Sequence, residues 1–146
     1  MKRSRRLQPV ARLAENHEQQ AARALGDAQT QLTQAEQRLG ELQSYREEYE
    51  RRFQQMGSSG MGSLQMADYR QFLHNLSKAI EQQEVIVQQA MNLVVQRKQH
   101  WFAKRGNTQM LDNVVQRYES MEQREDDRKS QREQDERSSR GHHHHD

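Results

Sequence analysis

The residues of this chain that could do acid–base or metal chemistry are scattered along it. Three histidines stand far apart and lack the spacing of metal ligands: His17, His74 and His100. Adjacent carboxylates occur at Glu47–Glu48 and Asp126–Asp127, where a polar context is typical of a solvated helix face and not of a dry acid–base pair. The sequence has no glycine-rich phosphate loop and no cysteine. It therefore predicts no enzyme, no catalytic residue, no metal site and no cofactor.

Two further stretches suggest binding chemistry near the ends of the sequence. The run from His142 to His145 could hold transition metals weakly, but it also fits a natural low-complexity end or an expression remnant. Four basic residues precede Pro9: Lys2, Arg3, Arg5 and Arg6. A DNA-binding zipper needs a much longer basic helix, and the formal net charge here is only +2. We expect no nucleic-acid partner; a steep salt dependence of DNA affinity would indicate one.

The composition limits the elements that could position any site. Of 146 residues, 32% are hydrophobic and 30% are charged, which is too little apolar material for a compact core of this length. Good helix formers dominate, and Pro9 is the single proline. No stretch approaches the length of a membrane span, so we expect a cytoplasmic protein with no direct membrane insertion. These properties predict an elongated, all-α architecture.

A seven-residue repeat of apolar side chains runs through the first third of the chain. Its members are Leu7, Ala14, Ala21, Ala28, Ala35, Leu42, Tyr49 and Met56. A companion series completes an a/d heptad pattern: Ala11, Leu25, Leu32, Leu39 and Phe53. Such a narrow stripe faces a partner helix, and its strict period predicts a left-handed supercoil. We expect a first coiled-coil helix over residues 5–56.

Clustered Gly and Ser then predict a hairpin tip over residues 57–63, with Ser63 as the N-cap of a second helix. A second repeat follows: Leu73, Ile80, Val87, Val94, Trp101, Thr108 and Val115. Because it keeps its phase across Gly106, we expect one continuous helix over 64–125 with a weak turn there. Residues 126–146 lack apolar side chains, so this charged tail should fray into disorder by about Arg137. The fold class is a long antiparallel two-helix coiled coil.

The start of the second helix carries more apolar surface than the repeat needs. Phe72, Leu76, Ala79 and Gln83 form a separate line beside Leu73 and Ile80. One interpretation is that a wide stripe shields the hairpin. The other is that this line docks a partner protein, because a structure two helices thick cannot cover both lines.

At these residues the chain resembles the FliJ family of flagellar type III export proteins. The matching segments span roughly residues 7–105, in the correct order: Ala21 to Gly26, Gln34 to Glu36 with Leu39 and Leu42, Tyr45 to Tyr49, Tyr69 to Phe72, Leu76, Lys78 to Gln82, and Trp101. The resemblance implies a helical hairpin similar to the central stalk of rotary ATPases. It also implies a non-catalytic coupling role in flagellum biogenesis, type III secretion and motility.

The resemblance further implies three kinds of partner: the hexameric export ATPase, the cytoplasmic platform of the export gate, and export chaperones. Carried onto this sequence, the gate contact falls on Tyr69, Phe72, Leu76, Ala79 and Gln83. The contact with the ATPase ring is expected at Leu7, Leu13, Ala21, Arg23 and Leu25. The implied location is peripheral, at the cytoplasmic face of the inner membrane at the flagellar base. The alternative is a structural coiled-coil tether or spacer with no role in energy coupling.

Overall fold

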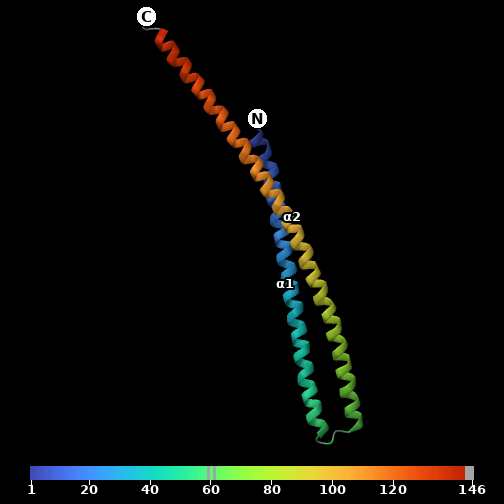
Figure 1. The fold of residues 1–146 in the computed structure, drawn as a ribbon. Coiled ribbons are helices and arrows are strands. Elements are labelled where there is room, and N and C mark those ends of the chain that lie inside the picture. The colour runs from blue at the N-terminus through green and yellow to red at the C-terminus, as the bar shows by residue number, and fades with distance from the viewer. Residues whose placement is uncertain (59, 61, 144–146) are drawn as a thin grey trace. The chain divides into compact units, whose positions relative to one another are not determined.

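The computed structural model describes residues 1–58, 60 and 62–143, and it forms two long helices within these ranges. Helix α1 spans Arg3–Ser58 and helix α2 spans Ser63–His143 (Figure 1). Between them Gly60 has a φ of 87°, a left-handed conformation that suits glycine because it has no Cβ. The predicted all-α antiparallel hairpin is confirmed. Residues 59 and 61 of the predicted tip lie outside the described residues.

The helix ends differ from the expected boundaries by a few residues on either side of the tip. Helix α1 starts at Arg3, earlier than residue 5, and continues to Ser58. Helix α2 starts at Ser63, but Gly62 takes the cap position because its carbonyl accepts a hydrogen bond from the Met66 amide at 3.0 Å. The expectation that Ser63 is the N-cap is therefore wrong.

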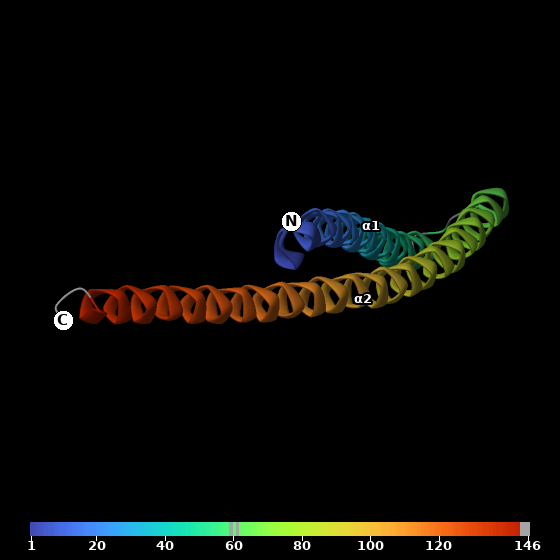
Figure 2. The same cartoon turned by 90° about the horizontal axis from the view of Figure 1, so that it is seen from above.

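The charged tail is helical well beyond the point where fraying was expected. Helix α2 continues without a break through Gly106 and on to His143, and Figure 2 shows its ribbon unbroken toward the C-terminal end. Side chains four residues apart support it: Gln123 donates to Asp127 at 3.1 Å and Gln131 to Asp135 at 3.2 Å. Residues 144–146 of the predicted tail lie outside the described residues. Over the described ranges, no helical stretch has the length and apolar character needed to cross a membrane.

The chain divides into two compact units, which we describe separately. The hairpin unit is Ala21–Trp101, and the terminal unit combines Met1–Gln20 with Phe102–Asp146. In each unit a segment of α1 packs against an antiparallel segment of α2.

Small side chains on the seven-residue repeat form the core of the hairpin unit. Ala21, Ala28 and Ala35 are buried, and Leu76 and Ile80 of α2 are buried as well, Ile80 being 5% exposed. An alanine every seventh residue lets the two backbones come close. The predicted alanine stripe is therefore the core of this unit.

Packing in the terminal unit has a different character. Its two buried residues among those described are polar, Ser4 and Thr108. The Thr108 hydroxyl donates a hydrogen bond to the backbone carbonyl of Lys104, in the same helix, at 3.1 Å. The repeat residues Leu7, Ala14 and Val115 are only half-buried. The two helix segments of this unit therefore leave open grooves between them.

Replacing the buried Ile80 with alanine should destabilise the hairpin unit. Loss of a buried aliphatic side chain typically lowers the free energy of unfolding by about 2 kcal/mol or more. Val85→Ala is the matched control, because Val85 is 56% exposed on the same helix and its truncation should change the free energy by less than about 0.5 kcal/mol. Urea denaturation followed by circular dichroism measures both. Equal effects of the two variants would contradict the assignment of Ile80 to the core.

Candidate partner-binding surfaces

The residues predicted to contact the export gate all lie on α2 of the hairpin unit, but they are not equally accessible. Phe72 is 39% exposed, whereas Leu76 is 8% exposed and belongs to the packed core. Tyr69, Ala79 and Gln83 are half-buried. The expectation that the whole line is left free by the helix pairing is wrong for Leu76, because this side chain packs in the interface with α1. A partner reaching this line would meet mainly Phe72.

An aromatic cluster holds Phe72 in place. Its ring lies 4.5 Å from the Tyr49 ring, measured between centroids, and Tyr69 lies 6.1 Å from Tyr49 and 5.7 Å from Phe53. Tyr45 extends the cluster along α1, with its centroid 5.0 Å from that of Tyr49. Rings at these separations and tilts attract one another beyond the burial of their area. The cluster therefore fixes the orientation of α2 against α1 while part of Phe72 stays exposed.

Gln83 also serves the packing between the two helices. Its Nε2 donates a hydrogen bond to the backbone carbonyl of Ala35 at 3.0 Å. The sequence placed Gln83 on a docking line, and nothing in a seven-residue pattern distinguishes an outward glutamine from one that bridges to the neighbouring backbone. A partner that contacts Gln83 would compete with the Ala35 carbonyl for the Gln83 amide group.

The residues predicted to contact the ATPase ring are divided between the two units. Leu7 and Leu13 belong to the terminal unit, where Leu7 is half-buried and Leu13 is 55% exposed. Ala21, Arg23 and Leu25 belong to the hairpin unit. There Ala21 is 4% exposed and occupied by the helix pairing, while Arg23 is exposed. Leu7 and Leu25 are half-buried, so Leu13 and Arg23 are the two exposed members of the set.

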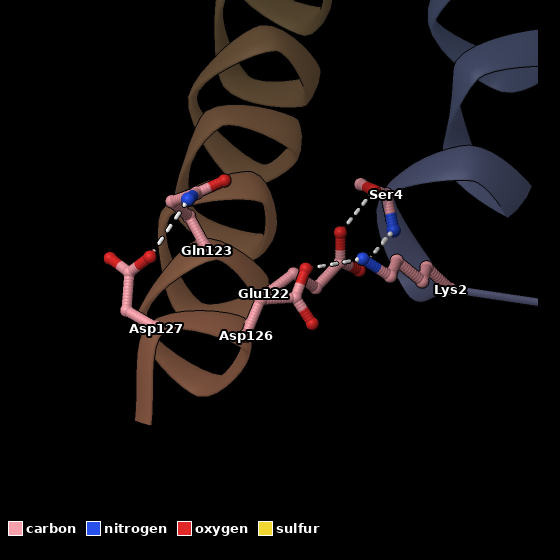
Figure 3. Close-up of polar contacts among 6 residues, drawn as sticks. All are labelled: Lys2, Ser4, Glu122, Gln123, Asp126 and Asp127. Carbon is pink, nitrogen blue, oxygen red and sulfur yellow. Dashed lines mark hydrogen bonds and ion pairs between the residues drawn. The ribbon is translucent and has the colours of Figure 1, made fainter. Parts of the chain in front are cut away.

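Sequence reasoning missed a polar clamp at the start of α1 (Figure 3). The Ser4 amide donates to Glu122 Oε1 at 3.1 Å, and the Ser4 hydroxyl donates to Glu122 Oε2 at 2.5 Å. Lys2 forms an ion pair with Asp126 at 2.9 Å. The first turn of a helix has free amides and favours negative charge, yet α1 has no acidic residue there. Glu122 of α2 supplies both the acceptor and the charge.

The clamp shifts the ionisation of its own members. The hydrogen bond from the Ser4 hydroxyl is the main cause that lowers the pKa of Glu122 below its usual 4.5. The hydrogen bond to Asp126 is the main cause that raises the pKa of Lys2 above 10.5. Arg3 lies beside the clamp with its guanidinium carbon 5.7 Å from the centroid of the Tyr118 ring. Both shifts favour the charged forms of Glu122 and Lys2, which are the forms that the clamp pairs.

The described part of the chain gathers no three histidine or carboxylate side chains that could hold a metal ion. The side chains of the histidine run lie outside the described residues. The described surface that a partner could contact consists of apolar and charged side chains on the two helices.

Comparison with known proteins agrees with this class of protein. The sequence model of the family described as "Flagellar FliJ protein" matches residues 2–146. The flagellar FliJ protein of Salmonella typhi is 31% identical over 111 residues, covering 76% of each chain. That of Escherichia coli (strain K12) is 31% identical over 105 residues, covering 72% of this chain and 71% of the relative. Among solved structures none matches significantly.

The chain therefore belongs to the FliJ family, and the resemblance inferred from its residues is confirmed. Membership places it among the components of the flagellar export apparatus.

The clamp predicts a pH-dependent stability of the start of α1. Because the pKa of Glu122 is lowered on folding, its contribution is fully present above its unfolded value near 4.5 and is lost as the pH falls through the folded value. Lys2 has a raised pKa, so its contribution is present below 10.5 and is lost as the pH rises through the folded value. We expect Glu122→Gln to speed amide hydrogen exchange over residues 3–10 at neutral pH and to lose this effect in acid.

Glu133→Gln is the control for this measurement, since Glu133 is exposed on the same helix and has no partner on α1 among the described residues. An unchanged exchange rate in Glu122→Gln at neutral pH would show that the clamp does not hold the helix start.

Proposed function

We propose that this protein is a non-catalytic coupling component of the flagellar protein-export apparatus, which binds the hexameric export ATPase and the platform of the export gate and escorts export chaperones. The observation that carries the proposal is the match to the FliJ family along the chain. The coiled-coil hairpin supports it, because its chemistry is packing and charge at exposed helix surfaces. The proposed location is the cytoplasmic face of the inner membrane at the flagellar base, without insertion into the bilayer.

Phe72 is the residue through which we propose the gate contact. It is the most exposed aromatic side chain on the predicted line, and the Tyr49 ring fixes its position. A large, rigid and partly exposed ring is the kind of anchor that dominates protein interfaces. Tyr69, Ala79 and Gln83 would contribute at its edges, whereas Leu76 would act by supporting the surface from within.

Phe72→Ala should impair swimming while the hairpin stays folded. The variant removes the proposed anchor and one ring of the aromatic cluster, but it leaves the buried Leu76 and Ile80 in place. The two helices should therefore still form, which circular dichroism checks. The diameter of the swimming zone in soft agar, measured after complementation of a deletion strain, reports the effect. Leu64→Ala is the control, because Leu64 is 83% exposed at the start of the same helix. Normal swimming of the strain that carries Phe72→Ala would favour a structural tether without a coupling role.

Contact with the export ATPase is tested with purified proteins. The chain should bind the ATPase and stimulate ATP hydrolysis, and Arg23→Glu should reduce both because it reverses an exposed charge of the proposed contact. Arg38→Glu is the matched control, an exposed arginine further along α1. If the unmodified chain neither binds nor stimulates the ATPase, the proposed coupling role is wrong.

A further inference from the structure

The terminal unit carries a groove whose lining is mainly apolar and contains no carboxylate. The groove lies between the two helix segments and has a volume of about 220 Å³. Its apolar lining comes from both helices: Val10, Leu13, Ala14, Met110 and Leu111. Three of these side chains are well exposed, Val10 at 47%, Leu13 at 55% and Met110 at 58%. Their exposure leaves apolar area that packing within the unit does not use.

The lining of this groove holds one cationic side chain and no carboxylate. Lys104 lines it together with His17, and Lys104 has no carboxylate partner among the described residues. Residues seven apart share a face of a supercoiled helix, so the line of Met110 continues into Arg117 and Arg124, whereas the line of Leu111 continues into Tyr118 and Glu125. Neither arginine forms an ion pair within the described part of the chain. Two carboxylates of α2 that face the start of α1, Glu122 and Asp126, are engaged by the clamp.

The other side of the same helix pair is different. A second groove, beside Ala11 and Val115, is lined by Glu15 and Asp112 as well as Arg12, so both signs of charge meet there. The terminal unit is therefore two-sided, with an apolar and basic groove on one side and a polar, mixed-charge groove on the other. An asymmetry of this kind selects partners by charge as well as by apolar contact.

We propose that the apolar groove binds an amphipathic helix of a partner protein that carries aliphatic anchors along one face and acidic residues beside them. Both walls of the groove are helices with internally paired backbones, so no strand edge is offered for β-pairing. A third helix laid between two others places side chains three or four residues apart into the groove. The volume exceeds the roughly 150 Å³ of a cavity known to accept benzene, so aliphatic anchors fit. Carboxylates flanking the anchors would reach Lys104 and Arg117.

A second copy of this chain is a poorer occupant. Its own apolar groove carries the same basic charge and would repel. Its most acidic stretch, residues 125–136, contains no apolar side chain that could act as an anchor. A lipid surface is also a poorer fit, because a bilayer takes up a convex apolar face more readily than a groove between two helices.

This inference goes beyond the proposed function and does not depend on it, although Leu13 belongs to both. Its test uses the full-length chain without any other export component. A phage-displayed library of helical peptides would be selected on the immobilised chain, with aliphatic or alanine choices at the anchor positions and Glu, Lys or Gln choices at the flanks. We expect enrichment of aliphatic anchors with Glu flanks.

A selected peptide, fluorescently labelled, should then lose about tenfold or more in affinity towards Leu13→Asp and Met110→Asp, since hot-spot substitutions cost at least about 1.4 kcal/mol. Gln116→Asp adds the same charge beside the other groove and is the matched control. Lys104→Gln should weaken binding and reduce its salt dependence. Leu13→Asp and Met110→Asp both replace exposed side chains, and circular dichroism checks that the two variants fold.

Four results would overturn the proposal. In the first, the library yields no binding peptide; in the second, the selected peptides carry basic or neutral flanks. In the third, the peptide binds the groove variants and the Gln116→Asp control equally well. In the fourth, a second copy of the chain or a lipid surface occupies the groove. The last is read from sedimentation of the chain alone and from binding to phosphatidylglycerol vesicles. Self-association or vesicle binding that Leu13→Asp abolishes would assign the groove to a second copy or to a membrane surface.

Discussion

The pairing of a narrow alanine stripe on α1 with larger side chains on α2 is the constraint on which the hairpin unit depends. Ala21, Ala28 and Ala35 are buried and small enough to let the backbones approach, and Leu76 and Ile80 are buried nearer the hairpin tip. A chain this rich in charge has little other apolar material to bury. In the hairpin unit, a partner can therefore contact only the side chains that the packing of α1 against α2 leaves exposed.

The terminal unit shows what happens when the same repeat continues with weaker packing. Its buried residues among those described are Ser4 and Thr108, so polar contacts replace the alanine core. Apolar positions there stay half-buried or exposed, and grooves open along both sides of the helix pair. One helical hairpin thus offers two kinds of surface: an aromatic anchor held by a tight core in the hairpin unit, and an apolar, basic groove in the terminal unit.

The sequence predicts the helices, their antiparallel order and the alanine core, because a seven-residue period is a property of one chain segment and can be read directly. It does not predict which residues beside the repeat are covered. Leu76 and Phe72 have the same apolar character, yet only the geometry of the pair shows that Leu76 is buried and that Gln83 reaches the Ala35 carbonyl. The length of the charged tail helix was underestimated because local pairs such as Gln131 with Asp135 support a helix without tertiary contacts. The contact of Ser4 with Glu122 joins residues 118 positions apart and has no local signal.

The clamp of Ser4 by Glu122 has an evolutionary consequence for the terminal unit. An α-helix advances about 1.5 Å and turns about 100° for each residue, so one residue inserted between Ser4 and the apolar groove would carry the hydroxyl around the helix and away from its acceptor. An insertion of seven residues would restore the face but not the height. Length changes in this part of α1 therefore keep the clamp only when they are whole heptads and α2 changes by the same number. To keep this contact, the two helix segments must change length together.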